Sequence, residues 1–218
     1  MRYKKLIEDT NPVSKSQSAQ SILNAATTLF LEKGYKNVTT RDIAALAGVN
    51  LGLIPYYFTS KINLAKQSCL NMMEELTRSI RYDLSSLSDA EQMYVSSVLM
   101  WHSLDGDPAA SRFYYEFVEA TDALDTYTLS FIASTWQVIK HYNLQVSETE
   151  NSLYLTVMKA AERTLVIKLY RRELNITQQD IVEILTSNYF YNIGLPDREI
   201  ARIIQTGQAY CRKCLAEV

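Results

Sequence analysis

Residues 39–54 (TTRDIAALAGVNLGLI) have the spacing of two short helices joined by a tight turn. Ala44, Gly48 and Ile54 stand where a helix-turn-helix needs a small residue, a turn residue and a buried aliphatic residue. Glycine at the bend can adopt a positive φ, which other residues rarely do. Because this geometry presents the second helix at the surface, the segment predicts a DNA-binding element.

The length and composition of the chain favour two helical domains. The chain has 218 residues, 47% of them hydrophobic, and only Gly 6 and Pro 4 to interrupt long helices. We therefore expect an all-α protein with an N-terminal three-helix DNA-binding domain over residues 1–61 that contains the helix-turn-helix. Residues 1–14 would form a mobile arm, which either enters a minor groove or is an ordinary frayed terminus. Residues 62–218 would form a helical ligand-binding and dimerisation domain.

Apolar residues recur at helical spacing along most of the chain. The N-terminal helices are expected at about 16–33, 39–47, 50–57 and 60–87. The following helices are expected at about 89–104, 109–119, 122–141, 147–173, 177–192 and 197–216.

Charge is distributed unevenly between the two predicted domains. Residues 1–61 hold eight Lys or Arg and four Asp or Glu, a net charge of +4; the whole chain carries −2, so residues 62–218 carry −6. A locally positive head suits attraction to phosphate, which acts over about 8–10 Å at physiological salt. No apolar run approaches the ~20 residues that span a bilayer. We expect a cytoplasmic protein without membrane contact.

The sequence contains no arrangement typical of a catalytic site. It has no evident pair of nucleophile and base, no glycine-rich phosphate loop and no set of metal ligands. We therefore expect neither enzymatic activity nor a metal or cofactor. Cys211 and Cys214 form one C-x-x-C without a second pair, which favours packing over a redox or zinc role.

The segment from about Ala19 to Leu64 resembles the tetracycline-repressor (TetR) family of bacterial regulators. The matching pieces are, in order, Ala25-Ala26, Leu29-Phe30, Lys33-Gly34-Tyr35, Thr39-Thr40-Arg41-Asp42-Ile43-Ala44, Ala47-Gly48-Val49, Gly52-Leu53-Ile54, Tyr57-Phe58 and Ser60-Lys61. The resemblance implies an all-α homodimer with a variable core that binds a small molecule. It also implies that this ligand changes the separation of the two DNA-binding heads.

Pro55 departs from the family pattern, in which a tyrosine or another residue with a backbone N–H is usual at this position. Proline lacks that donor and disfavours helical geometry at the preceding residue, Ile54. We expect Pro55 to shorten or kink the second helix, unless the helix is so short that Pro55 falls in its first turn.

Contacts with DNA are expected from both helices of the motif. Base contacts would come from Asn50, Leu51, Gly52 and Leu53. Asn50 either pairs with adenine or only caps the helix, and the two leucines either contact thymine methyl groups or form a small satellite core. Phosphate contacts would come from Thr39, Thr40, Arg41, Tyr56, Tyr57 and Lys61.

Aromatic side chains are concentrated beyond residue 80. Each fits an ordinary core position, but the family resemblance implies that some of them line a ligand pocket between helices. The candidate pocket residues are Trp101, His102, Phe113, Tyr114, Phe117, Tyr127, Phe131 and Trp136.

The helices near 177–192 and 197–216 present apolar faces that predict a homodimer through a four-helix bundle. The first face comprises Ile181, Ile184, Leu185 and Tyr189, and the second runs from Ile200 to Cys214. Two heads about 34–36 Å apart would bind a palindromic operator.

Two functions fit these observations. The first is a transcriptional regulator, more often a repressor, whose affinity for double-stranded DNA is changed by a small molecule. The second is a protein–protein co-regulator that keeps the fold but no longer contacts DNA. Pro55 and the apolar run 51–54 motivate this alternative, because an exposed apolar patch can bind protein.

Overall fold

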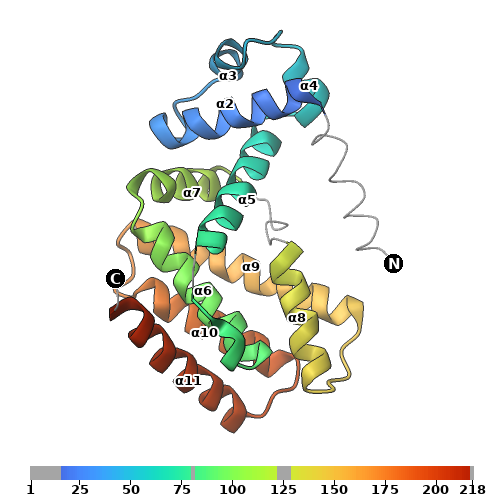
Figure 1. Cartoon of the computed structure of the whole chain (residues 1–218), viewed down its shortest axis with the longest axis vertical. Coiled ribbons are helices and arrows are strands. Elements are labelled where there is room, and N and C mark those ends of the chain that lie inside the picture. Colours follow the sequence, from blue (N-terminus) through green and yellow to red (C-terminus); the bar gives the residue numbers. More distant parts are fainter. Residues whose placement is uncertain (1–15, 80–81, 122–128, 217–218) are drawn as a thin grey trace. The chain divides into compact units, whose positions relative to one another are not determined.

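The computed structural model describes residues 16–79, 82–121 and 129–216, and in these ranges every regular element is a helix. The predicted all-α class is therefore confirmed. No helix in these ranges is both long and apolar enough to span a bilayer. Figure 1 shows the helices, which are α2 (Gln17–Lys33), α3 (Thr40–Ala47), α4 (Leu53–Phe58), α5 (Lys61–Ser79), the 3₁₀ helix η2 (Leu84–Ser86), α6 (Asp89–Asp105), α7 (Pro108–Ala120), α8 (Leu129–His141), α9 (Glu148–Tyr170), α10 (Gln178–Asn192) and α11 (Asp197–Ala216).

Side chains at the helix starts explain where four of these helices begin. In a capping box, the N-cap hydroxyl accepts a hydrogen bond from the third backbone N–H of the helix, and the acidic side chain of that third residue accepts from the N-cap backbone N–H. Each box satisfies two backbone donors that lack a partner within the helix. The boxes are Thr39 with Asp42 at α3, Ser88 with Glu91 at α6, Ser147 with Glu150 at α9, and Thr177 with Asp180 at α10.

The chain divides into two packed units. The first comprises the residues up to Met72 together with Asp107–Asp122, and the second comprises Met73–Gly106 and Ala123–Val218. Helix α7 therefore belongs to the first unit, although it follows α6 of the second unit in sequence. These units describe packing and not function. The boundary predicted at residue 61, between a DNA-binding and a ligand-binding domain, stays a prediction.

The first unit is built around α2. Helix α2 contacts α3, α4 and α7, and its buried face includes Ile22 and Phe30. Ile43 of α3 and Ile54 of α4 are also almost completely buried. This small core fixes α3 and α4 on α2.

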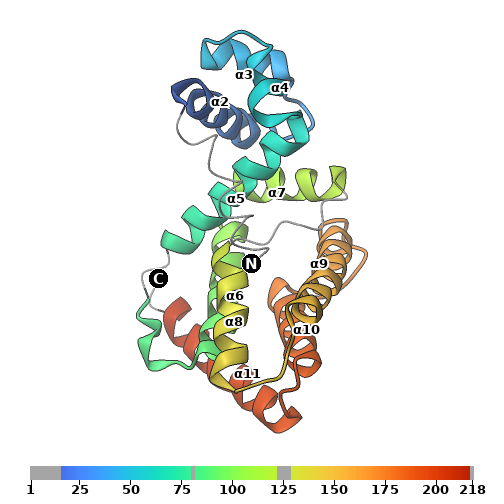
Figure 2. The ribbon, with the colours of Figure 1, turned by 90° about the vertical axis from the view of Figure 1, so that its right-hand side faces the viewer.

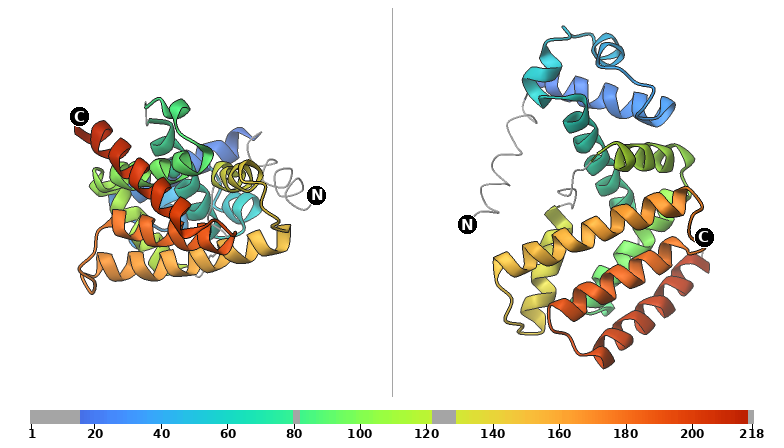
Figure 3. Two further views of the ribbon diagram at one scale, coloured as in Figure 1. Left: turned by 90° about the horizontal axis from the view of Figure 1, so that it is seen from below. Right: turned by 180° about the vertical axis from the view of Figure 1, so that it is seen from behind.

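The second unit is centred on α6 and α10. Helix α6 contacts α8, α10 and α11 (Figure 2), and α10 lies between α9 and α11 (Figure 3, right). Tyr94 of α6 and Phe190 of α10 are fully buried. Gly207 lies on the buried face of α11, and the absence of a side chain there allows the ring of Tyr94 to approach the helix.

The helix expected over 60–87 is wrong in its C-terminal part. Helix α5 ends at Ser79 within the described residues, and residues 84–86 form a 3₁₀ turn instead. The side chain of Asp83 accepts a hydrogen bond from the backbone N–H of Ser85 at 3.0 Å. Short polar side chains compete with helical hydrogen bonds in this way, and residues 83–88 contain several of them.

The close contact between α6 and α11 predicts the effect of filling Gly207. A Cβ at Gly207 would lie 2.4 Å from Cδ1 and 2.9 Å from Cε1 of Tyr94. We expect Gly207→Ala to lower the free energy of unfolding by about 1–3 kcal/mol, because overpacking outweighs the usual helical preference for alanine. Gly106→Ala is the control, because the nearest atom to a Cβ at Gly106, the carbonyl oxygen of His102, would be 3.5 Å away.

Urea unfolding followed by tryptophan fluorescence measures the effect, since Trp101 and Trp136 both lie in the second unit. Equal stability of Gly207→Ala and the unaltered chain would contradict the packing described here.

Candidate nucleic-acid interface

Helix α3 starts at an exposed capping box. The backbone N–H and the hydroxyl of Thr39 both donate to the Asp42 carboxylate, at 2.8 and 2.6 Å, and the Asp42 backbone N–H donates to the Thr39 hydroxyl at 3.2 Å. The hydrogen bonds from the Thr39 side chain and backbone lower the pKa of Asp42. The predicted phosphate ligand Thr39 is therefore engaged within the helix start. Thr40 and Arg41 follow on the first turn, half-buried and exposed respectively.

A left-handed glycine makes the turn between α3 and α4. Gly48 has φ 65 and ψ 33, and its backbone N–H donates to the carbonyls at the end of α3. The backbone N–H of Val49 donates to the carbonyl of Ala44 at 3.1 Å. These bonds close α3 and turn the chain sharply toward the next helix.

Helix α4 begins at Leu53, three residues later than expected. The side-chain oxygen of Asn50 accepts from the backbone N–H of Gly52 at 2.9 Å, so residues 50–52 form a turn rather than a helical start. The Asn50 side chain therefore caps this turn and not the helix, whose N-cap residue is Gly52. Asn50 is exposed, so a base contact through its amide group stays a prediction. Leu51 is 41% exposed and Leu53 is half-buried, so Leu51 does not lie in a satellite core.

Pro55 does not disturb α4. The helix has only six residues, and Pro55 lies in its first turn, where a backbone N–H would have no partner within the helix. Ile54 is helical despite preceding a proline, and the carbonyl of Pro55 accepts from the backbone N–H of Thr59 at 3.0 Å. The helix has no kink at Pro55. As expected for so short a helix, Pro55 falls in its first turn.

Three further residues predicted to contact phosphate, Tyr56, Tyr57 and Lys61, lie near the end of α4. Tyr56 is 77% exposed, whereas Tyr57 is half-buried with its hydroxyl 2.8 Å from the hydroxyl of Ser16. Lys61 donates from Nζ to the carbonyl of Tyr35 at 2.7 Å, and its Nζ lies 4.1 Å from the centre of the Tyr35 ring. Burial lowers the pKa of Lys61. The ammonium group has three donors, so one bond to Tyr35 leaves others for a phosphate.

The aromatic residues predicted to bind a ligand belong to two different units. Phe113, Tyr114 and Phe117 are buried on α7 in the first unit, where the Phe113 ring stacks on Phe30 at 5.0 Å between centroids. In the second unit, Trp101 is buried, His102 is exposed, and Phe131 and Trp136 are half-buried. Tyr127 lies outside the described residues.

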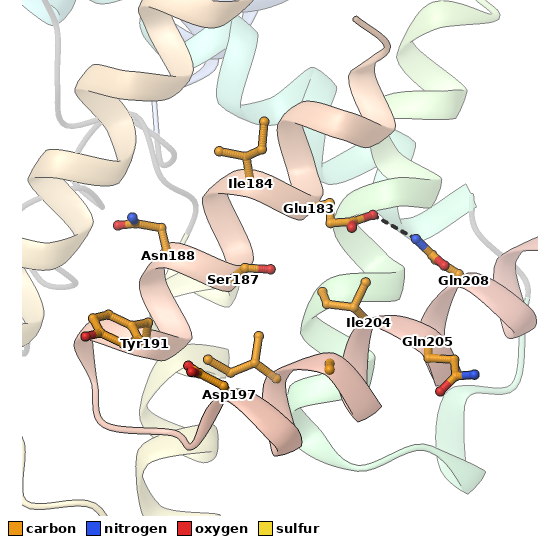
Figure 4. A pocket seen from close by; sticks show the side chains of 11 residues that line it. Glu183, Ile184, Ser187, Asn188, Tyr191, Asp197, Ile204, Gln205 and Gln208 are labelled. Carbon is orange, nitrogen blue, oxygen red and sulfur yellow. Dashed lines mark hydrogen bonds between the residues drawn. The ribbon is translucent and has the colours of Figure 1, made fainter.

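An open groove of about 630 Å³ separates α10 and α11 on the surface of the second unit (Figure 4). Ile184 and Tyr191 of α10 line it and are 53% and 65% exposed. A hydrogen bond of 2.7 Å from Gln208 of α11 to Glu183 of α10 crosses it. Three residues of the predicted dimer face, Ile181, Leu185 and Tyr189, are instead buried within the unit.

Helix α9 carries a buried polar group that the sequence pattern does not predict. The side-chain amide of Asn151 donates to the Thr135 hydroxyl at 3.2 Å, and its oxygen accepts from the Tyr189 hydroxyl at 2.7 Å. Further along the same face, Lys159 and Glu162 form an ion pair at 2.6 Å. Apolar periodicity cannot place these residues inside, because three of the five buried positions of α9 are polar. Among the described residues, no group of His, Cys, Asp or Glu is arranged to hold a metal ion.

Comparison with known proteins identifies similar regulators. Residues 22–67 match the model for bacterial regulatory proteins of the tetR family. The HTH-type transcriptional repressor KstR2 of Rhodococcus jostii is 27% identical over 122 residues, 56% of this chain and 59% of that protein. The HTH-type transcriptional repressor Rv3405c of Mycobacterium tuberculosis is 39% identical over 67 residues, 31% of this chain and 36% of that protein. The matches thus span less than two thirds of these relatives.

Solved structures share the fold over most of the chain. RolR (NCGL1110) in complex with its ligand resorcinol has a TM-score of 0.59 at 16% identity, covering 86% of this chain and 93% of that chain. A TetR transcriptional regulator from Rhodococcus sp. RHA1 has a TM-score of 0.54 at 16% identity, covering 82% and 96%. The likeness extends from the helix-turn-helix into the helical second unit.

The geometry at Gly48 predicts how the turn responds to substitution. A Cβ at Gly48 would have no neighbour within 4 Å, so only the positive φ opposes a side chain. We expect Gly48→Ala to destabilise the first unit by roughly 1–2 kcal/mol, and Gly48→Asn to lose less because asparagine tolerates this conformation. Amide hydrogen exchange of α3 and α4 measures this stability. Alanine and asparagine variants of equal stability would show that the backbone strain argument is wrong.

Proposed function

We propose that this chain, whose residues 22–67 match the tetR family of bacterial regulatory proteins, is a transcriptional repressor that binds double-stranded DNA through α3 and α4. The observation that carries the proposal is the exposed turn and short helix over residues 50–56, held on the buried side chains of Ile54 and Phe58. A helix anchored on one side and exposed on the other is the geometry that enters a major groove.

The sides of this surface suit contact with the DNA backbone. Arg41 and the start of α3 would approach phosphates, because helix N-termini attract anions. Lys61 and the hydroxyl of Tyr57 would contribute from the neighbouring helices. Such contacts orient the protein on DNA without selecting the sequence, so selection would depend on Asn50 and its neighbours.

Specific binding would require two copies of the chain. A helix of six residues reaches few base pairs, and two such helices related by a two-fold axis would bind a palindromic operator. We place the dimer contact at the groove between α10 and α11, where Ile184 and Tyr191 are exposed. A two-fold contact pairs the same surface of both copies, so one groove with exposed Ile184 and Tyr191 serves both.

The second unit would bind the effector. RolR, which shares this fold, was solved with resorcinol. Trp101, Phe131 and Trp136 remain the candidate aromatic contacts within this unit, whereas Phe113 and Phe117 are committed to packing in the first unit. A ligand that binds one dimer conformation more tightly would shift the population toward it and change operator affinity. A protein with this function would act in the cytoplasm.

A charge in the groove should break the proposed dimer. Ile184→Glu would bring two carboxylates into an apolar contact, and we expect the dimer dissociation constant to rise at least about tenfold. Leu153→Glu is the matched control, because Leu153 is 57% exposed on α9 away from the groove lining. Sedimentation equilibrium measures both. A dimer that survives Ile184→Glu, or one that dissociates with Leu153→Glu, places the interface elsewhere.

Replacement of Asn50 separates base recognition from capping. In Asn50→Ser the hydroxyl can still accept from the N–H of Gly52, but the amide that pairs with adenine is lost. We expect discrimination between duplex from upstream of the protein's own gene and scrambled duplex to fall by about 1–3 kcal/mol. Fluorescence anisotropy measures both affinities. Unchanged discrimination would leave Asn50 with the cap alone.

The same titration tests the co-regulator alternative. Leu46, Leu51 and Tyr56 are 55%, 41% and 77% exposed in the first unit, an apolar surface that could bind protein. Absence of binding to any duplex by the unaltered chain, together with a stable protein partner at this surface, would favour the alternative.

A further inference from the structure

The last turn of α2 is capped by a side chain distant in sequence. Arg112 of α7 donates from Nη2 to the carbonyl oxygens of Leu31 and Glu32, at 2.7 and 2.8 Å. Carbonyls at a helix C-terminus lack partners within the helix, and a cation there also interacts favourably with the helix dipole. Arg112 therefore satisfies the end of α2 from outside the helix-turn-helix.

A second side chain of α7 holds the turn that follows. The carboxylate of Glu116 accepts from the backbone N–H of Lys36 at 2.9 Å. Gly34 has φ +80, and a Cβ at this position would lie 2.6 and 2.8 Å from the two carboxylate oxygens of Glu116. The turn thus requires glycine both for its conformation and for the approach of Glu116.

Aromatic contacts fix α7 between these two polar contacts. Phe113 stacks on Phe30 of α2, and Phe117 meets the ring of Tyr35 edge-on at 6.3 Å between centroids. Lys61 donates to the carbonyl of Tyr35. The backbone of residues 31–36 is therefore held by side chains of α7 and α5.

We propose that Arg112 and Glu116 are positioning residues for DNA binding, and that α7 is a structural part of the DNA-binding unit. The segment they hold leads directly to Thr39, which caps α3. Apolar contacts alone would let α7 slide along α2. The directional hydrogen bonds of Arg112 with the Leu31 carbonyl and of Glu116 with the Lys36 N–H fix one position of the backbone. Burying Arg112 has a cost, because its Nε is buried without a hydrogen-bond partner. This inference rests on the proposed DNA-binding function.

The test is made in the full chain. For each residue it compares a variant that loses the hydrogen bond with a conservative variant that can still form it. Glu116→Met removes the acceptor for the Lys36 N–H, whereas Glu116→Gln keeps an acceptor oxygen. Arg112→Met removes the cap of α2, whereas Arg112→Lys retains a donor. Glu75→Met and Lys140→Met are controls that remove one exposed charge from the second unit.

Hydrogen exchange tests the positioning without DNA. In Glu116→Met we expect the amide of Lys36 to exchange at least about tenfold faster, and in Glu116→Gln we expect it to stay close to the unaltered rate. Slow exchange of amides in the middle of α2 confirms that the first unit of each variant is folded, and tryptophan fluorescence reports on the second unit. Unchanged exchange in Glu116→Met overturns the proposal.

Fluorescence anisotropy with upstream duplex at several salt concentrations tests the consequence. We expect both methionine variants to bind about five- to tenfold more weakly with the same salt slope, because no phosphate contact is lost. A slope flatter by about one would show that the residue contacts phosphate, and a glutamine variant as weak as the methionine variant would exclude positioning. If the unaltered chain binds no duplex, the proposed function fails, while the exchange measurement still decides the contact.

Discussion

Satisfaction of backbone groups at the helix ends is the constraint on which this structure depends. Every helix leaves four N–H and four carbonyl groups without partners inside it, and an all-helical chain has many such ends. Capping boxes satisfy the starts of α3, α6, α9 and α10. In the first unit, the backbone N–H of Gly48 caps the C-terminus of α3, and the side chain of Arg112 caps the C-terminus of α2. These contacts set where each helix begins and ends, and so where the exposed turn 50–52 lies.

Local signals explain why much of the fold could be predicted from sequence. Thr39 before α3, Gly48 after it and the apolar stripe of α2 act within a few residues, so their outcome can be inferred without a structure. The same reasoning failed over residues 82–87, where hydrophobic spacing suggested a continuing helix but residues 84–86 form a 3₁₀ turn among short polar side chains. The start of α4 was misplaced because Asn50, three residues before the helix, uses its side chain for the turn.

Long-range contacts account for what the sequence could not predict. Phe113 and Phe117 look like any aromatic residues of a helical core, and only the structure assigns them to α2 and Tyr35 in the first unit. Arg112 and Glu116 read as solvated charges on an amphipathic helix, whereas their partners are backbone groups some eighty residues earlier. On α9, Asn151 and Lys159 occupy inward positions because each has a polar partner there, which periodicity does not reveal.

Pro55 helps to keep the short exposed helix α4 ordered, although a helix of this length is unstable by itself. Isolated helices of one or two turns are unstable in water, because the backbone entropy lost exceeds what a few hydrogen bonds return. A proline in the first turn has its φ fixed before folding, so less entropy remains to be lost there. Helix α4 is therefore ordered in advance of any encounter, and a partner that binds this surface does not bear the cost of ordering it.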